Sequence, residues 1–204
     1  MINTKERILN TALVLFNNYG LSQVTLRTIA KEMNISQGNL NYHFKKRDEI
    51  IESLYYRLVM SIDESFVKNK QDIISLKMFF DISTDVLNSF YAFRFFFLDY
   101  VQIMRENAVI KKHYIELMKL RKVQIMEIFN LLVDKGIMRK EELPNEYLNL
   151  YDRFQIIGDF WISSAEVVAD EIEKDVIVKY SEILKQTIYP YLTETGKKEY
   201  YKFN

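Results

Sequence analysis

The sequence contains no cysteine, and this absence removes several kinds of chemistry at once. Without thiols the chain forms no disulfide and holds no iron–sulfur cluster or thiolate zinc site. Its two histidines, His43 and His113, are too few to build a histidine metal site. We therefore expect no metal and no cofactor, and a cytoplasmic location, where proteins fold without disulfides.

Proline and glycine are also scarce, with two and five among 204 residues. Strands joined by tight turns need more of both, so the composition favours an all-α fold. No stretch approaches the roughly 18 apolar residues of a membrane span. The first residues, MINTKERIL, are charged from the start and lead into an amphipathic pattern. We therefore expect neither export nor a membrane partner.

The net charge of zero hides an uneven distribution of charge along the chain. Residues 1–47 hold seven basic and two acidic side chains, a net charge of +5, so the remainder carries −5. Such a difference between segments is typical of a small unit that faces nucleic acid, attached to an acidic body.

Residues 1–47 show the pattern of three short helices. Thr4 is a candidate N-cap for the first, and Gly20 can end it in a backbone conformation that glycine adopts easily. Thr25 can cap the second helix and Ser36 the third, with Asn34 in the tight turn between them. Two short helices joined so closely predict a helix-turn-helix.

The third of these helices, within NISQGNLNYHF, is unusually polar. At about 100° per residue, Leu40 and Phe44 face inward, and the opposite face carries amides and one aromatic ring. Amide side chains can bind adenine edges in the major groove, and the basic residues Lys46 and Arg47 that follow suit phosphate contact. The alternative is a helix that is merely solvated. The outward residues are Gln37, Gly38, Asn39, Asn41 and Tyr42.

Four motifs appear in order: T-x-x-x-I-L-x-x-A-x-x-L-F, then YG, VTLRTIA and IS-x-GNL-x-YHF. Together they resemble the N-terminal domain of the TetR family of bacterial transcriptional regulators. The resemblance covers about the first fifty residues and implies contacts to bases or the DNA backbone. With Ser36 and Lys46 added, the candidate DNA-binding residues are Thr25, Arg27, Ser36, Gln37, Gly38, Asn39, Asn41, Tyr42, His43, Lys46 and Arg47.

Three positions depart from the common pattern of that family. Asn34 stands where the turn usually has glycine, Asn41 replaces a frequent tyrosine, and Arg47 replaces a frequent lysine. Asparagine tolerates the left-handed conformation of the turn. The change at Asn41 exchanges a phenol for an amide, which leaves the operator sequence unpredictable.

From residue 48 the chain becomes a larger helical body, and we take residues 48–204 as the second domain. A helix from about 47 to 66 connects the two domains. Further helical patterns cover about 72–89, 91–105, 108–135, 145–169 and 172–190, with breaks at 69–71, 135–136, 144 and 169–170. The charged tail from Glu194 is expected to be frayed or loosely docked.

The run SFYAFRFFFLDY, residues 89–100, is apolar nearly all round and predicts a helix surrounded by others. Its rings either pack a solid core or line a cavity. The TetR resemblance implies a small-molecule pocket here, which would bind a small hydrophobic effector, with Arg94 or Arg153 as partner of a ligand carboxylate. Asp159 is expected to form an interhelical ion pair. The candidate ligand-binding residues are Met78, Phe79, Phe93, Arg94, Phe97, Tyr100, Met104, Met118, Arg153, Phe154 and Trp161.

The last two long helices carry apolar stripes and small residues, Gly158 and Ser163–Ala165, that permit close helix approach. In the family that the chain resembles, these helices form the homodimer interface. We therefore predict an all-α dimeric repressor that binds double-stranded, palindromic operator DNA and is released by its effector. The alternatives are a helical adaptor with a vestigial DNA-binding unit, or an enzyme. No catalytic residue is evident, because nucleotide loops and nucleophile motifs are missing and His113 suggests a solvated surface residue.

Overall fold

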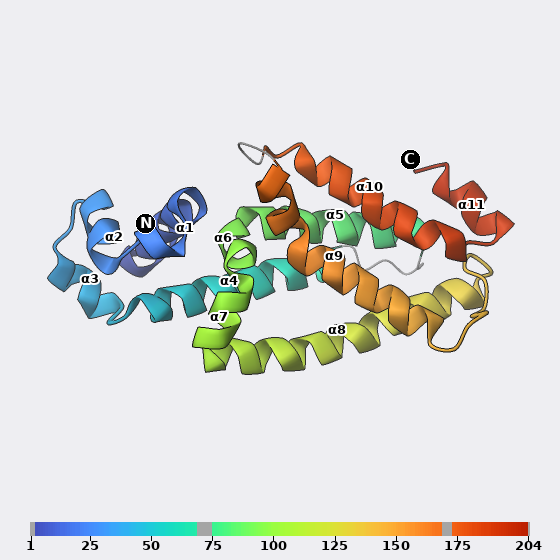
Figure 1. Cartoon of the computed structure of the whole chain (residues 1–204), viewed down its shortest axis with the longest axis horizontal. Coiled ribbons are helices and arrows are strands. Elements are labelled where there is room, and N and C mark those ends of the chain that lie inside the picture. The colour runs from blue at the N-terminus through green and yellow to red at the C-terminus, as the bar shows by residue number, and fades with distance from the viewer. Residues whose placement is uncertain (1–2, 69–74, 169–172, 204) are drawn as a thin grey trace.

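The computed structural model describes residues 3–68, 75–168 and 173–203. Within these ranges it consists of eleven α-helices and two short 3-10 turns, which confirms the predicted all-α fold. A small unit of three helices lies at one end of an elongated molecule (Figure 1). A long helix, α4 (Arg47–Lys68), runs from this unit, which we call the head, into a helical bundle, which we call the body. α4 begins at Arg47, the last residue of the predicted first domain.

The head contains α1 (Thr4–Tyr19), a 3-10 turn (Leu21–Gln23), α2 (Leu26–Glu32) and α3 (Gln37–His43). Thr25 and Ser36 cap α2 and α3 as predicted. The prediction that Thr4 caps α1 is wrong, because Asn3 Oδ1 accepts from the Glu6 amide at 2.8 Å and the helix begins one residue earlier. Both residue types can cap a helix, so sequence alone does not separate adjacent candidates.

A compact apolar core holds the head together. Ile8, Phe16, Ile29 and Leu40 are fully buried, so each of the three helices contributes its inward stripe. Asn34 adopts φ 54°, the left-handed conformation that the tight turn between α2 and α3 requires. The predicted helix-turn-helix is therefore confirmed.

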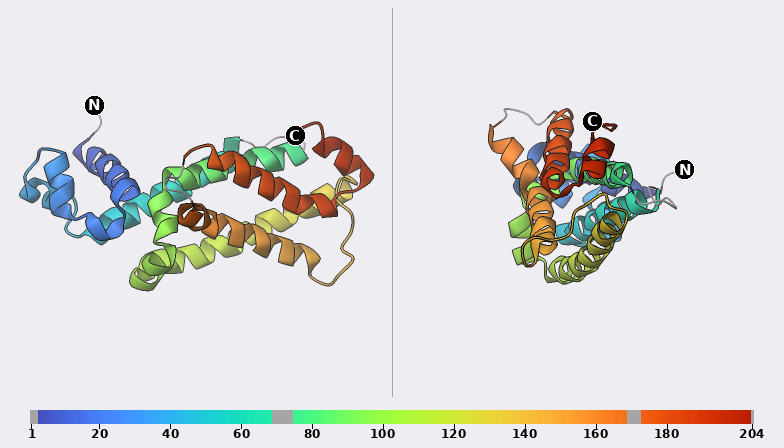
Figure 2. Two further views of the ribbon diagram at one scale, coloured as in Figure 1. Left: turned by 45° about the horizontal axis from the view of Figure 1, so that its top comes forward. Right: turned by 90° about the vertical axis from the view of Figure 1, so that its right-hand side faces the viewer.

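In the body α4 packs mainly on α5, and Figure 2 shows the bundle along its length and end-on. The first residues of the predicted helices at 72–89 and 172–190, and the predicted breaks at 69–71 and 169–170, lie outside the described residues. The described helices are α5 (Leu76–Ala92), α6 (Arg94–Leu98), α7 (Tyr100–Glu106), α8 (Ala108–Asp134), α9 (Glu146–Val168), α10 (Val176–Ile188), a 3-10 turn (Tyr189–Tyr191) and α11 (Glu194–Tyr200).

The prediction of a single helix at 91–105 is wrong, because the helix is interrupted at Phe93 and again at Asp99. A side chain from the head explains the first break. Asn17 Nδ2 donates to the Ala92 carbonyl at 2.9 Å, and Asn17 Oδ1 accepts from the Phe95 amide at 3.1 Å. These two bonds satisfy backbone groups that a continuous helix would have paired within itself.

The C-terminal tail is not loosely docked as predicted. It forms α11, whose Tyr200 is buried edge-on against Phe80 of α5 with ring centroids 5.7 Å apart. Glu199 accepts from the Leu76 amide at 2.8 Å. The charges in this segment suggested a solvated tail, but its aromatic residues and one carboxylate find partners on α5.

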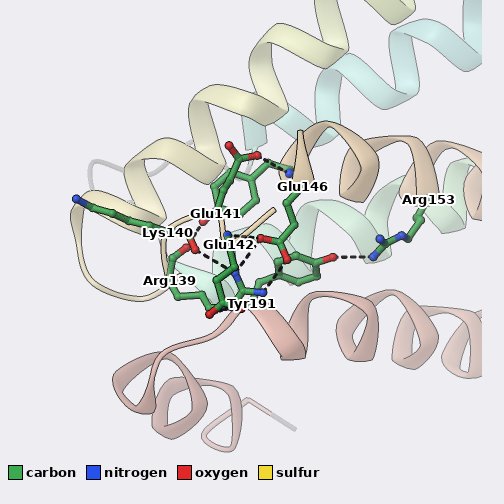
Figure 3. A network of polar contacts seen from close by, with 8 residues as sticks. Arg139, Lys140, Glu141, Glu142, Glu146, Arg153 and Tyr191 are labelled. Carbon is green, nitrogen blue, oxygen red and sulfur yellow. Dashed lines mark hydrogen bonds and ion pairs between the residues drawn. The ribbon is translucent and has the colours of Figure 1, made fainter. Parts of the chain in front are cut away.

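The end of the body farthest from the head is closed by a polar network (Figure 3). Arg139 donates to both carboxylate oxygens of Glu146, at 2.8 and 2.9 Å, and its guanidinium lies over the Tyr191 ring. The hydrogen bonds from Arg139 lower the pKa of Glu146 to about 2. Arg153 of α9 donates to the Tyr191 hydroxyl at 2.6 Å. Through Arg153 and Arg139, α9 and the connection that precedes it are both tied to the turn after α10. Within the described ranges, no helix has the length and apolar character that crossing a membrane requires.

Candidate functional sites

The exposed face of α3 has the composition that the sequence predicts. Leu40 and Phe44 are buried in the head, whereas Tyr42 on the opposite side is 86% exposed. Gln37, Gly38, Asn39 and Asn41 are exposed as well. An exposed aromatic ring flanked by amides has no role in the core of the head, so this face is available for contact with another molecule.

The other candidate DNA-binding residues differ in exposure. Thr25, Arg27, Ser36 and Lys46 are exposed at the same end of the molecule, and His43 is half-buried beside Tyr42. Arg47 is half-buried because its Nη1 donates to the Leu21 carbonyl at 2.8 Å. This bond holds the turn after α1 against the start of α4, so any phosphate contact by Arg47 would use its remaining N–H groups.

A cavity of about 190 Å³ lies in the body. Side chains from α4, α5, α6, α8, α9 and α10 form its walls, and most of them are aromatic or aliphatic. The aromatic lining residues are Tyr55, Phe66, Phe79, Phe90, Phe96, Phe97, Tyr114, Tyr151 and Phe154.

Four of the predicted ligand-binding residues line this cavity: Phe79, Phe97, Met118 and Phe154. The structure does not place the others there. These are Met78, Phe93, Arg94, Tyr100, Met104, Arg153 and Trp161.

The contacts of three of these residues show why they do not line the cavity. Arg94 lies over the Tyr91 ring and points toward the head, and Arg153 is committed to Tyr191 at the distal end. Trp161 is buried against Tyr180 of α10, and its indole N–H has no hydrogen-bond partner among the described residues. Helical spacing alone does not tell which side of a fully buried helix borders a void.

Two charged side chains line the cavity, Arg121 and Asp159, and the sequence analysis placed neither of them there. Arg121, which was not predicted, is 8% exposed, pairs with Asp63, donates to Gln124 at 2.8 Å and lies over the Phe66 ring. A basic residue in the charged run of α8 gives no sequence signal of burial, because the turn of the helix around it is mostly polar.

Asp159 differs from the interhelical ion pair that was predicted for it. It is 8% exposed and accepts from the Tyr114 hydroxyl at 2.8 Å. Burial raises its pKa from 3.8 to about 6, although hydrogen bonds from Tyr114 and Gln155 act in the opposite direction. Burial also raises the pKa of Tyr114 above its usual range, so this hydroxyl remains a donor.

His113 is not the solvated residue that the sequence suggested. Its Nδ1 lies 2.8 Å from the Tyr55 hydroxyl, and its ring packs edge-on against Tyr55 and Tyr56. Because Tyr55 lines the cavity, the contact with His113 helps to fix the position of one lining side chain. In the part of the chain that the structure describes, no three metal-ligating side chains converge on one point.

The head and the cavity share one short helix. Phe95 of α6 stacks on Phe16 of α1 with centroids 5.2 Å apart, beside the two Asn17 hydrogen bonds. The next two residues of α6, Phe96 and Phe97, line the cavity. The helix α6 therefore contacts both the head and the cavity.

A helix-turn-helix head on a helical body with an internal cavity defines a class of DNA-binding regulators. Two family models match the chain: bacterial regulatory proteins, tetR family, at residues 8–54, and bacterial transcriptional repressor, TetR, at residues 43–200. The chain belongs to the TetR family of transcriptional regulators. It is therefore a DNA-binding transcriptional regulator and not an enzyme, since this family consists of non-enzymatic transcription factors.

Individual relatives are more distant. The protein described as "Probable HTH-type transcriptional regulator YttP" from Bacillus subtilis is 26% identical over 160 residues, which cover 73% of this chain and 70% of that protein. A TetR-family regulator from Marinobacter aquaeolei has a TM-score of 0.88 at 22% identity, covering 98% and 97% of the two chains. A protein from Saccharomonospora viridis described as a transcriptional regulator, solved in complex with choline, has a TM-score of 0.73 at 17% identity, covering 93% and 97%.

Replacing Tyr42 by alanine tests the exposed face of α3. Because Tyr42 makes no core contact, Tyr42→Ala should leave the melting temperature nearly unchanged and weaken operator binding by about 1 to 3 kcal/mol. Fluorescence anisotropy at fixed salt on a duplex selected from a random library measures the affinity. Tyr19→Ala, at the exposed end of α1, is the matched control and should bind like the wild type. Equal affinity of Tyr42→Ala and wild type would contradict the assignment of α3.

Replacing Asp159 by asparagine tests the buried carboxylate. The folded protein holds this proton more tightly than the unfolded chain, so the contribution of Asp159 to stability falls as the pH rises from about 4 through 6. Asp159→Asn should therefore increase the free energy of unfolding at about pH 7.5 by about 1 to 3 kcal/mol.

The increase in unfolding free energy should shrink as the pH falls toward about 3, below the pKa of the carboxyl in both the folded and the unfolded state. Urea unfolding of the wild type and Asp159→Asn at a series of pH values measures the difference in unfolding free energy. Asp152→Asn, an exposed residue on the same helix, should show no comparable gain. A gain that is absent at neutral pH or independent of pH would refute the buried, raised-pKa carboxyl.

Proposed function

We propose that this protein is a dimeric repressor that is released from palindromic operator DNA when a small molecule occupies the cavity. The observation that carries the proposal is the double role of α6, which lines the cavity with Phe96 and Phe97 and holds the head through Phe95. The description of the matching family model as a bacterial transcriptional repressor supports repression.

The apolar cavity supports a small-molecule effector. Pockets for small ligands are concave and largely apolar with a few polar groups, and this cavity has Arg121 and Asp159 in a mostly aromatic and aliphatic wall. The choline complex of the Saccharomonospora viridis protein shows a ligand bound to a chain with this fold. The candidate effector contacts are therefore the lining residues, rather than Arg94 or Arg153.

The outer face of α9 supports a homodimer. Ile156, Phe160 and Val167 are exposed at 62%, 43% and 86% and are spaced by four and seven residues, so they form one apolar stripe. Val178 on the adjacent α10 is also exposed. Such a stripe on neighbouring helices is a suitable isologous interface.

The small residues of α9 have other positions than the sequence suggested. Gly158 lines the cavity, and a Cβ there would lie 3.4 Å from the Phe90 ring. Ser163 donates to the Phe97 carbonyl at 3.1 Å, and Ala165 is buried. Gly158 therefore allows α9 to approach α5 within the protomer, and it is not a residue of the proposed interface.

Release of DNA requires that the effector bind the DNA-incompetent arrangement more tightly. Two recognition helices in a dimer engage successive major grooves only when they lie about 34 to 36 Å apart. An occupant that pushes Phe96 or Phe97 moves α6, against which α1 packs. Because α4 connects the head to the body, this movement changes the distance between the two recognition helices.

The dimer is tested by a charge on the α9 stripe. Ile156→Glu places a carboxylate in the proposed interface but in solvent on the protomer, so it should shift the protein to monomer without lowering protomer stability. Sedimentation velocity measures the mass. Val123→Glu, on the exposed side of α8 with 56% exposure, is the matched control and should remain dimeric. A wild-type monomer, or an unchanged dimer of Ile156→Glu, would exclude this interface.

The coupling is tested at Asn17. A compound found by thermal shift screening should weaken operator binding by about 5- to 150-fold, and operator should weaken compound binding by the same factor. Asn17→Ala removes both hydrogen bonds to the break before α6. It should leave compound affinity within about twofold and reduce the coupling factor at least about threefold.

Asn18→Ala changes the neighbouring exposed residue, which has only a 3.5 Å contact with Arg94, and should keep the coupling. Calorimetry and anisotropy titrations, with and without the other partner, give both factors. A compound whose affinity is indifferent to operator would overturn the release mechanism.

A further inference from the structure

The two charged residues of the cavity differ in how their charges are balanced. Arg121 lies at the wall with Asp63 as its ion-pair partner and Gln124 as a further acceptor. Its positive charge is therefore already compensated within the protein. An anionic ligand would have to compete with Asp63 for it.

Asp159 has no such compensation. Its carboxylate accepts hydrogen bonds from Tyr114 and Gln155, both uncharged groups. Among the residues that the structure describes, no lysine, arginine or histidine forms an ion pair with it. A carboxylate that is 8% exposed and lines an apolar cavity leaves a net negative charge there.

The rest of the lining is suited to a positive charge. The faces of aromatic rings attract cations, and the lining includes the rings of Tyr114, which donates to the carboxylate, and of Phe154, which precedes it on α9. Metal ions need several oxygen or nitrogen ligands, and Asp159 is the only carboxylate in the described lining. The complementary occupant is therefore organic.

We propose that the cavity binds a small organic cation, an amine or quaternary ammonium that carries apolar groups, with Asp159 as its counterion. This inference rests on the proposed function, because it names the chemical class of the effector. It differs from the sequence-based expectation of a hydrophobic effector whose carboxylate would pair with Arg94 or Arg153.

The size of the cavity limits the occupant. A buried cavity of about 150 Å³ accepts benzene, and this one measures about 190 Å³. A single ring with a short amine-bearing chain fits this volume. Binding also removes the unfavourable free energy of the isolated carboxylate, since a cation in contact with Asp159 supplies the charge that the protein lacks.

Three compounds of nearly equal size and different charge test the inference: 2-phenylethylamine, 2-phenylethanol and phenylacetate. Isothermal titration calorimetry at about pH 7.5 gives their affinities for the full-length wild type. The amine should bind at least about tenfold more tightly than the alcohol, as expected for a hydrogen bond to a charged partner. Phenylacetate should bind most weakly.

Variants locate the effect. In Asp159→Asn, which keeps the shape of the side chain, amine affinity should fall at least about tenfold while the affinity for the alcohol stays within about threefold. Asp152→Asn makes the same charge change on the exposed side of α9 and should retain the wild-type preference. Because the alcohol reports on cavity integrity, a misfolded variant is recognised by the loss of both compounds. Asp159→Ser, which also removes the charge, then serves as the second variant and should likewise lose the preference for the amine.

Three results would overturn the inference: alcohol or phenylacetate binding as tightly as the amine, amine affinity unchanged in Asp159→Asn, or no amine binding to the wild type. Titrations with operator DNA distinguish a failure of the cation-site proposal from a failure of the proposed release mechanism. If a neutral or anionic compound binds and weakens operator affinity, the release mechanism is supported and the proposal of a cation-binding site is refuted. An amine that binds with the expected preference but leaves operator affinity unchanged supports the cation site and refutes the release mechanism.

Discussion

The seating of α1 on α6 is the contact on which the rest of this structure depends. Phe16 belongs to the core of the head and also stacks on Phe95, while Asn17 pairs the backbone groups left open where the helix breaks. From Phe95 the ring contacts continue through Phe96 to Phe97, with centroids 6.4 and 5.5 Å apart. The head and the cavity are therefore parts of one packed aromatic chain, and close-packed side chains transmit a displacement instead of absorbing it.

The cavity departs from an ordinary core in its charges. A fully apolar lining would stabilise the body more than one with a buried carboxylate, because an uncompensated charge is unfavourable in an apolar environment. The charge of the buried Arg121 is balanced within the protein, by its ion pair with Asp63. Asp159 lacks an equivalent partner in the described chain, and this difference distinguishes a binding group from a structural ion pair.

The distal network and α11 supply rigidity at the end opposite the head. Arg139 pairs with Glu146 at the α8–α9 connection and lies over Tyr191 of the turn between α10 and α11 (Figure 3). Tyr200 packs α11 against Phe80 of α5. At the other end, α6 and α4 connect the cavity to the head, which is where the proposed coupling would act. The exposed stripe of α9 then relates two such heads across the proposed dimer axis.

The amino-acid sequence by itself determined the head, because its helices are amphipathic, and their caps at Thr25 and Ser36 and the turn at Asn34 depend on neighbours a few residues away. It also predicted a helical body with aromatic rings near residues 89–100. Only the tertiary structure decided which rings border a cavity, where Arg94 and Arg153 point, and that Asp159 faces an apolar space. A helix that is apolar all round has no face that its sequence distinguishes, so its surroundings are set by helices distant along the chain.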